Sequence, residues 1–290
     1  MNSNEIEKIK IKRYINQFGR IPNLAHPSTF SEKLLKRLIY DIDPYYRLYA
    51  TKLYAPYFFK NRKIKNLNFT KRYGVFREIQ PDDILNIKAK RLVLKSSWAS
   101  GLNQVIIDKK NVDLQKICDR FNQNIKVITN AKNFNDNYNA IIAEEFLGDN
   151  LYDFRDFRFH CFRDLNNKLF MNITYYQNAH SKNERQCNFD ENLNELNYSL
   201  SSIKHESLKI NKPECFESMK EIASELSLGF DYIRVDLVLI KNKIYFGELT
   251  PYQSGGIIKK INLDIDKKLG EYWHYRKISF DPNQISELEI

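Results

Sequence analysis

Two extended segments near the end of the chain, joined by a short turn, constrain the fold more than any other feature. Residues 231–240 alternate polar and apolar side chains, which places Arg234 and Asp236 on one face of a strand and apolar residues on the other. After a predicted three-residue turn at 241–243, residues 244–250 continue the extended pattern. The pattern therefore predicts a β-hairpin with one wet face and one dry face.

The register of this hairpin would bring two acidic residues together. If the residues that flank the turn, at 240 and 244, pair with each other, Asp236 lies directly opposite Glu248. Arg234 then lies opposite Thr250. Two carboxylates about 5 Å apart repel by roughly 3 kcal/mol at an effective dielectric near 20. A shared proton or a divalent cation with oxygen ligands would relieve this repulsion, and the alternative is a surface hairpin whose acids pair with Arg234 or lysines.

A second candidate site lies at the tip of an earlier hairpin. Residues 91–96 predict a short buried strand that contains Lys95, and a loop of small polar residues at 96–103 separates it from a strand at 104–108. Backbone amides of such a loop can cover phosphate oxygens while the lysine ammonium contacts them. The segment lacks the Gly-Lys-Ser/Thr sequence of a Walker A loop, and an ordinary hairpin tip with a solvated lysine is the alternative. Four of the nine glycines lie in the candidate site segments, namely Gly101, Gly247, Gly255 and Gly256.

The remaining segments predict an α+β protein. Apolar residues at helical spacing in 5–18 and 29–41 indicate a mainly helical N-terminal region. Residues 156–162 alternate strictly, with the polar side chains on one face of a strand. Further predicted elements are helices at 111–124 and 213–228, a strand at 140–147, a hairpin strand at 169–175 and an irregular insertion at 181–211.

Composition excludes several classes of protein. The chain has 290 residues, of which 42% are apolar, and this supports a substantial core and argues against disorder. No run of about 18 apolar residues occurs, and the N-terminus lacks the apolar core of a signal peptide, so we expect a soluble, cytoplasmic protein. The four cysteines match no zinc-ligand or redox spacing and are expected to be reduced, structural thiols.

The net charge of +10 favours an anionic partner. Charge alone leaves nucleic acid, an anionic membrane surface, nucleotide phosphates and acidic polysaccharide open. Because no recognisable nucleic-acid-binding module accompanies the charge, we do not expect nucleic acid to be the partner.

Taken together, these motifs resemble those of the ATP-grasp superfamily, in particular its TupA-like branch, which is associated with teichuronopeptide and other surface-polysaccharide biosynthesis. The resemblance spans roughly residues 29–273. It implies an ATP cleft between two α+β lobes, with a mainly helical region at 1–85, a mobile lid at 86–147 and a central subdomain at 148–290. The most specific segments are 93–101, 142–147, 156–162, 233–237 and 245–251, followed by Gly255 and Gly256.

The resemblance also implies roles for individual residues. Asp236 and Glu248 would bind Mg²⁺, and Thr250 would be a further ligand at a position where many ATP-grasp enzymes carry Asn. Arg234 would stabilise charge on the transferred phosphoryl group, and Lys95 would hold the nucleotide phosphates. The predicted ATP-binding residues are Lys52, Lys95, Ser100, Gly101, Glu144, Glu145, Phe146, Leu147 and Asp156, and the predicted catalytic residues are Lys95, Arg158 and Arg234.

The function implied by the resemblance is that of an ATP-dependent carboxylate-amine ligase. A substrate carboxylate would attack the γ-phosphate of ATP, and an amine would then displace phosphate from the resulting acyl phosphate. No protein nucleophile is needed, which agrees with the lack of a Ser-His-Asp or Cys-His arrangement in the sequence. His160 could act as a base near the amine, and a hydrogen-bonded strand histidine is the alternative.

The substrates expected from the resemblance are a sugar carboxylate and a small amine. The carboxylate would be a uronic acid of a surface polysaccharide such as a capsule, or of its nucleotide-sugar precursor, and the amine an amino acid or amino alcohol. Peripheral contact with membrane-bound polysaccharide machinery could accompany this role. Two alternatives stay open: a sugar kinase that uses the same cleft, and a non-catalytic glycan-assembly protein without nucleotide affinity.

Overall fold

A computed structural model of the chain contains two β-sheets, each packed against helices. The described residues are 3–275, except for 41–43, 61, 99–100, 131–138, 149–153, 180–182, 201–202, 204, 257 and 259–260.

Helices dominate the N-terminal region, as predicted. Four helices come before the first strand, namely α1 (Ser3–Phe18), α2 (Phe30–Tyr40), α3 (Pro44–Ala50) and α4 (Ala55–Lys60). Apolar residues of α2 recur at helical spacing and are buried in a cluster that includes Phe30, Phe162, Tyr232 and Trp273. Two members of this cluster come from strands of the larger sheet, so α2 packs directly against that sheet.

The larger sheet has seven strands in the order β1-β11-β10-β6-β7-β8-β9. Their bounds are β1 (Leu67–Asn68), β6 (Arg155–Arg163), β7 (Leu169–Gln177), β8 (Arg185–Asp190), β9 (Glu195–Leu196), β10 (Tyr232–Ile240) and β11 (Lys243–Thr250). Neighbouring strands are antiparallel except β1 with β11. Alternation in β6 and β10 buries Phe157, Phe159, Val235 and Leu237 in the main core, together with the apolar face of α7 (Phe216–Leu226).

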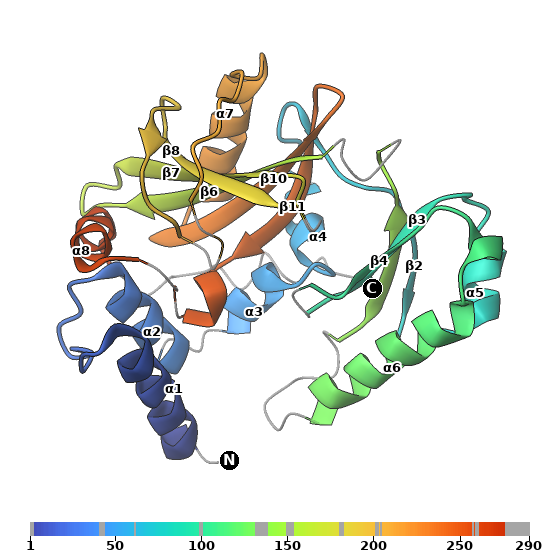
Figure 1. Ribbon diagram of the computed structural model, residues 1–290, viewed down its shortest axis with the longest axis horizontal. Coiled ribbons are helices and arrows are strands. Elements are labelled where there is room, and N and C mark those ends of the chain that lie inside the picture. The colour runs from blue at the N-terminus through green and yellow to red at the C-terminus, as the bar shows by residue number, and fades with distance from the viewer. Residues whose placement is uncertain are drawn as a thin grey trace.

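The smaller sheet has four strands in the order β2-β5-β3-β4. Their bounds are β2 (Arg72–Phe76), β3 (Leu92–Ser96), β4 (Asn103–Ile106) and β5 (Ile141–Glu145). This sheet and the helices α5 (Pro81–Asn86) and α6 (Leu114–Asn130) share a second core, which includes Leu94 and Phe121. Figure 1 shows this sheet with α6 on one side of the molecule and the larger sheet with α7 on the other. The boundaries of the predicted lid and central subdomain stay predictions.

The prediction of an irregular insertion at 181–211 is wrong for part of that segment. β8 pairs with β7, and β9 pairs with β8, so the segment adds two strands to the larger sheet. Polar composition indicated a loop, but the polar side chains of Gln186 and Asn188 on β8 are buried and hydrogen-bonded. Asn188, for example, accepts a hydrogen bond from Thr174 at 2.7 Å. Tertiary pairing here overrides the weak local preference for a loop.

Three short elements complete the described chain: η1 (Lys109–Asn111), η3 (Gln253–Gly256) and α8 (Leu263–Tyr272). The four cysteines are free thiols, and three of them are buried. Within the described parts of the chain, no helix combines the length and the hydropathy needed to cross a membrane.

Candidate active site

The turn between β10 and β11 is shorter than predicted. It has two residues, Lys241 and Asn242, both with positive φ (48° and 60°). A two-residue turn of this kind matches the right-handed twist of the strands. As a result Ile240 pairs with Lys243 and not with Ile244, so the pairing on which the predicted register was based is wrong.

A β-bulge at Gly247 nevertheless restores the predicted register at the acidic residues. β11 carries one extra residue at this point, and beyond it Asp236 pairs with Glu248 and Arg234 pairs with Thr250, as predicted. A Cβ atom on Gly247 would lie 2.8 Å from the backbone oxygen of Asp236, which only glycine avoids. Turn and bulge therefore compensate each other, and the two carboxyl groups come to lie opposite one another.

Both carboxylates contact a single guanidinium group. Nη2 of Arg234 lies 2.6 Å from Asp236 Oδ2 and 2.6 Å from Glu248 Oε1, and Nε donates to Asp236 Oδ1 at 2.6 Å. Thr250 Oγ1 donates to Glu248 Oε1 at 3.1 Å, and Gln253 accepts from Arg234 Nη1. The predicted convergence of the two acids is thus present, and Arg234 neutralises their repulsion in this structure.

Two further cations extend this network to neighbouring elements. Arg158, on β6 beside β10, donates from Nη2 to Asp156 Oδ2 at 2.7 Å and places Nε 3.6 Å from Asp236 Oδ2. Lys52 places Nζ 3.7 Å from Glu248 Oε2. Three cations and three carboxylates therefore share one region across β6, β10 and β11, and their charges balance.

The predicted wet face of β10 is in fact buried. The exposed fractions of Arg234 and Asp236 are 6% and 5%. Burial raises the pKa of Asp236 to about 7. Burial also opposes the ionisation of Glu248, but Arg234 and then Lys52 outweigh it and bring the pKa of Glu248 down to about 2. The polar face of β10 can be buried because its charges neutralise one another. The Asp236–Glu248 pair releases its first proton at low pH and its second only near neutral pH.

His160 is the hydrogen-bonded strand histidine that the sequence offered as an alternative to a base. Its Nδ1 lies 3.1 Å from the hydroxyl of Tyr232, and its Nε2 lies 3.3 Å from Oγ1 of Thr174. Burial, with Arg234 and Arg158 nearby, holds the pKa of His160 well below its ordinary value. A histidine that stays neutral and has both nitrogens partnered contributes to packing of the sheet.

A second ion-pair group lies on the smaller sheet. Nζ of Lys95 lies 2.8 Å from Oε2 of Glu144, and Nη2 of Arg72 lies 3.7 Å from Oε1 of the same carboxylate. Burial opposes the ionisation of Glu144, but Lys95 and Arg72 outweigh it and lower its pKa. The two predicted residues Lys95 and Glu144 are therefore in direct contact, on strands that pair with each other.

The segment between α3 and α4 connects the two ion-pair groups. The backbone N–H of Lys52 donates to the carbonyl of Ser97, two residues beyond Lys95, at 3.1 Å. The carbonyl of Lys52 accepts from Arg72 Nη2 at 3.1 Å, while its ammonium group faces Glu248. Lys52 thus contacts the loop after β3 with its backbone and the carboxylate pair with its side chain.

The other predicted ATP-binding residues that the structure describes lie near Glu144 or at the tip of the β3-β4 hairpin. Glu145 ends β5, and Phe146, which is buried, and Leu147 follow it. Gly101 is exposed and has a φ of 80°, a left-handed conformation that favours glycine. Ser100 lies outside the described residues. The roles of these residues stay predictions.

Three residues of the two groups were not predicted from the sequence. Arg72 lies opposite Glu144 in the pairing of β2 with β5. The ring of Tyr176 stacks under the guanidinium of Arg158 at 3.9 Å, and Gln253 contacts Arg234 from the segment before the paired glycines. Register could have revealed Tyr176, because it is the cross-strand partner of Asp156, but Arg72 and Gln253 come from segments with no distinctive pattern.

The oxygen atoms around Arg234 fit a hard divalent cation. Asp236, Glu248 and Thr250 offer oxygen ligands from two adjacent strands, which is the donor type that Mg²⁺ prefers. On the next strand, Oδ1 of Asp156 is buried and has no hydrogen-bond partner among the described residues. A buried carboxylate oxygen without a partner indicates that a further cation or donor belongs nearby.

Comparison with solved structures identifies several similar proteins. D-alanine-D-alanine ligase from Helicobacter pylori is 14% identical, with a TM-score of 0.43 over 77% of this chain and 59% of that chain. The ATP complex of D-alanine-D-alanine ligase from Bacillus anthracis is 11% identical, with a TM-score of 0.41 over 71% of this chain and 55% of that chain. Phosphoribosylglycinamide synthetase from Anaerococcus prevotii is 16% identical, with a TM-score of 0.36 over 75% of this chain and 49% of that chain. The chain thus spans less than two thirds of the length of these proteins.

No curated protein matches the chain. A family model described as TupA-like ATPgrasp matches residues 32–274, which is most of the chain. The match includes both sheets and both ion-pair groups. The α+β architecture, with a mainly helical N-terminal region, agrees with the predicted fold class. The chain therefore belongs to the TupA-like family of ATP-grasp proteins.

Proposed function

We propose that this protein is an ATP-dependent ligase that joins a carboxylate to an amine through an acyl phosphate. The observation that carries the proposal is the convergence of Asp236 and Glu248 on Arg234, with Lys52 at 3.7 Å from Glu248. An enzyme that transfers a phosphoryl group needs oxygen ligands for a metal and cations for the developing charge, and this cluster offers both.

The nucleotide would lie between the carboxylate pair and the loop after β3. Lys95 and the amides near Gly101 would contact the phosphates, and the segment from Glu144 to Leu147 would contact adenine and ribose. In this proposal residues 86–147 act as the lid. The Lys95–Glu144 ion pair would open when the phosphates compete for the ammonium group, because a phosphate carries more negative charge than a carboxylate.

Asp236, Glu248 and Thr250 would hold Mg²⁺, with Asp156 close by on β6. When bound there, Mg²⁺ neutralises negative charge on the phosphates of ATP. Arg234 would have to give up at least one of its two carboxylate contacts to make room. Its guanidinium would then be available for the γ-phosphate, and Arg158 would retain its bond to Asp156.

The chemistry proceeds in two displacements. An oxygen of the substrate carboxylate attacks the γ-phosphorus, the bond to ADP breaks, and an acyl phosphate forms. The amine nitrogen then attacks the acyl carbon, phosphate leaves, and the amine loses a proton to solvent or a base. Positioning and charge stabilisation carry out both steps without a protein nucleophile.

The substrate class follows from the family and from the charge of the chain. We propose that the carboxylate belongs to a uronic acid of a surface polysaccharide or its nucleotide-sugar precursor, and that the amine is an amino acid or amino alcohol. The net charge of +10 suits an acidic glycan or nucleotide sugar. A cytoplasmic protein in contact with membrane-bound polysaccharide machinery would meet such precursors.

Calorimetry with ATP and Mg²⁺, followed by an ADP-release assay, tests the proposal. We expect the purified chain to bind Mg-ATP and to release ADP only when both a uronic acid donor and an amine are present. Hydroxylamine in place of the amine should trap the acyl phosphate as a hydroxamate. ADP release that is indifferent to any carboxylate would reject the ligase, a stable phosphorylated sugar would identify a kinase, and a lack of nucleotide affinity would identify a non-catalytic protein.

Matched variants make this assay specific for the site. Asp236→Asn and Glu248→Gln should each abolish turnover while circular dichroism stays unchanged, because each removes a metal ligand. Glu217→Gln is the control, since Glu217 is an exposed glutamate on α7 that pairs with Lys212. Equal loss of turnover in Glu217→Gln would show that the assay reports a general defect.

A further inference from the structure

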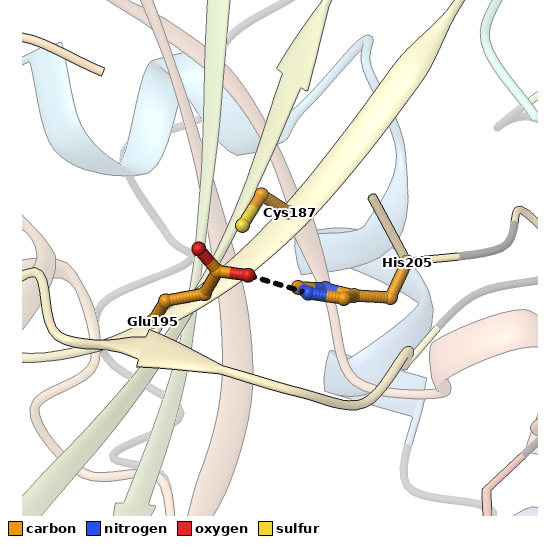
Figure 2. Close-up of side chains that lie close together, drawn as sticks. All are labelled: Cys187, Glu195 and His205. Carbon is orange, nitrogen blue, oxygen red and sulfur yellow. Dashed lines mark hydrogen bonds and ion pairs between the residues drawn. The ribbon is translucent and has the colours of Figure 1, made fainter. Parts of the chain in front are cut away.

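A second group of potential metal ligands lies three strands away from the proposed ATP site, on the larger sheet. Cys187 on β8, Glu195 on β9 and His205 beyond β9 offer ligand atoms that all lie within 4.8 Å of one another. Figure 2 shows the thiol of Cys187 and the ring of His205 both directed toward the carboxyl group of Glu195. Sequence spacing gave no sign of this group, because its members converge only through strand pairing.

Strand pairing determines how the three residues meet. β9 pairs with β8 so that Glu195 lies opposite Phe189, which is two residues from Cys187 and therefore on the same face. His205 is held beside β8 by a parallel bridge to Gln186. Three separate segments at one edge of the sheet thus each contribute one ligand.

The group lies on the opposite face of the sheet from the proposed Mg²⁺ ligands. Cys187 pairs with Tyr175, which pairs with Phe157, whereas Asp236 pairs with Arg158 on the other face. β8 is three strands from β10, a separation of about 14 Å at the usual strand spacing. The two groups therefore cannot share one ion.

His205 is mostly buried and faces Glu195 with one of its ring nitrogens. Its side chain is 10% exposed, and Nδ1 is buried with no hydrogen-bond partner among the described residues. Nε2 lies 3.0 Å from Oε1 of Glu195, and Oε2 of Glu195 accepts from Ser207 at 2.8 Å. A metal ion held with Glu195 would use Nε2, the nitrogen that already faces this carboxylate, whereas the buried Nδ1 would still need a partner of its own.

A nucleophilic role for Cys187 does not fit the same geometry. Its thiol is fully buried in the main core, so a substrate cannot reach it. Its Sγ lies 3.8 Å from the carbonyl of Asn188 and also has a backbone hydrogen-bond partner in Leu208, and no hydrogen bond between it and His205 is seen among the described residues. A thiol that no neighbouring base activates and that solvent does not reach is not placed to act as a nucleophile.

We propose that Cys187, Glu195 and His205 form a Zn²⁺ site that fastens β9 and residues 205–207 to the edge of the larger sheet. One sulfur, one nitrogen and one carboxylate oxygen are the ligand types that zinc takes. Bonds of about 2.0–2.3 Å put the ligands of a tetrahedral ion roughly 3.5 Å apart, so the group would contract by about 1 Å. Glu195, whose side chain is 36% exposed, can make that movement and leaves the fourth position open to water.

Binding would release the thiol proton, because zinc takes the thiolate. Burial raises the pKa of Cys187, so the free thiol is protonated at neutral pH and zinc must displace that proton. Zinc affinity should therefore increase with pH. Zinc binding would stabilise the β8-β9 edge of the sheet, and this effect does not depend on the ligase reaction proposed above.

Cobalt titration of the full chain, kept reduced and first treated with a chelator, tests the site. We expect one Co²⁺ per chain with a thiolate-to-cobalt charge-transfer band in the near ultraviolet and the visible bands of a tetrahedral ion, and Zn²⁺ should displace it. Cys187→Ala should abolish the charge-transfer band. His205→Gln and Glu195→Gln should weaken Zn²⁺ binding by at least about tenfold, the loss typical even for residues that only orient a ligand.

Two controls separate this site from other metal binding. Cys118→Ser removes a buried thiol of the smaller-sheet core, and Asp236→Asn removes a proposed Mg²⁺ ligand, so both should retain the band. Circular dichroism of each variant confirms that it folds. A wild-type chain without the band, or a band that persists in Cys187→Ala, overturns the proposal. Cobalt that binds without producing the charge-transfer band would also overturn the proposal, because oxygen ligands would then hold the ion.

Discussion

The opposed carboxylates of Asp236 and Glu248 permit a test in which two similar substitutions change stability in opposite directions. Burial raises the pKa of Asp236 from 3.8 to about 7. Between about pH 4 and pH 7 the folded protein therefore holds a proton that the unfolded chain has released, so the free energy of unfolding falls as the pH rises through this window. Glu248 behaves in the opposite way, because its pKa is lowered in the folded state. Its ionised form stabilises the folded protein above about pH 4.5, and this stabilisation is lost as the pH falls toward 2.

The magnitudes follow from the size of the two shifts. The rise in the pKa of Asp236 from 3.8 to about 7 corresponds to a loss of roughly 4 kcal/mol in the free energy of unfolding at pH 8. Asp236→Asn removes this loss, but the amide replaces only part of the hydrogen bonding to Arg234, which offsets about 1–2 kcal/mol. We therefore expect Asp236→Asn to be more stable than wild type by about 2 kcal/mol at pH 8. Glu248→Gln, whose pKa shift runs from 4.5 to about 2, should be less stable by about 1–3 kcal/mol, because the loss of its repulsion of Asp236 offsets part of the cost.

Urea unfolding at pH 8 and pH 5, with a chelator present, measures these differences. At pH 5 Asp236 is mostly protonated in the folded wild type, so the advantage of Asp236→Asn should shrink. Adding Mg²⁺ with a non-hydrolysable ATP analogue should then stabilise the wild type and neither variant. If both substitutions destabilise the chain to a similar extent at pH 8, the pair is a structural ion-pair group and the reasoning is refuted.

Three further predictions concern the elements that support the site. Gly247→Ala should destabilise the chain by about 1–3 kcal/mol and weaken cation binding, because the new Cβ would lie 2.8 Å from the backbone oxygen of Asp236; an unchanged melting temperature and Mg²⁺ affinity would contradict this. Arg37→Met should cost about 3–5 kcal/mol in urea unfolding, because it breaks the fully buried ion pair between Arg37 and Asp231, and a loss below about 1 kcal/mol would argue otherwise. Lys95→Ala should weaken ATP binding in calorimetry by about tenfold to a hundredfold, as expected for a lost charged hydrogen bond, whereas the exposed Lys116→Ala should leave it unchanged.

Local pattern was a sound guide to the strands that carry the chemistry. Strict alternation predicted β6 and β10 and assigned their faces correctly, because successive side chains of a strand point to opposite sides. The opposition of Asp236 and Glu248 was also predicted correctly, but from a wrong turn length. The bulge at Gly247 compensated the error, and a single glycine in a strand pattern was the signal that could have indicated it.

Burial and long-range pairing could not be predicted in this way. The polar face of β10 was expected to be wet, yet Arg234 is almost fully buried, because Asp236 and Glu248 neutralise it from within the sheet. Arg72 was missed because its contact with Glu144 depends on the pairing of two strands far apart in the sequence.

The sequence by itself determined the α+β character, the two hairpins and the residue types available for ATP chemistry, since these depend on periodicity and on the properties of single side chains. Tertiary structure alone decided which of those residues meet. Lys52 joins two sheets through its backbone and side chain, and Cys187 meets His205 across a strand edge, although neither contact has a sequence motif. The physical reason is that hydrogen bonding between distant strands sets side-chain proximity, and that pairing depends on the whole chain.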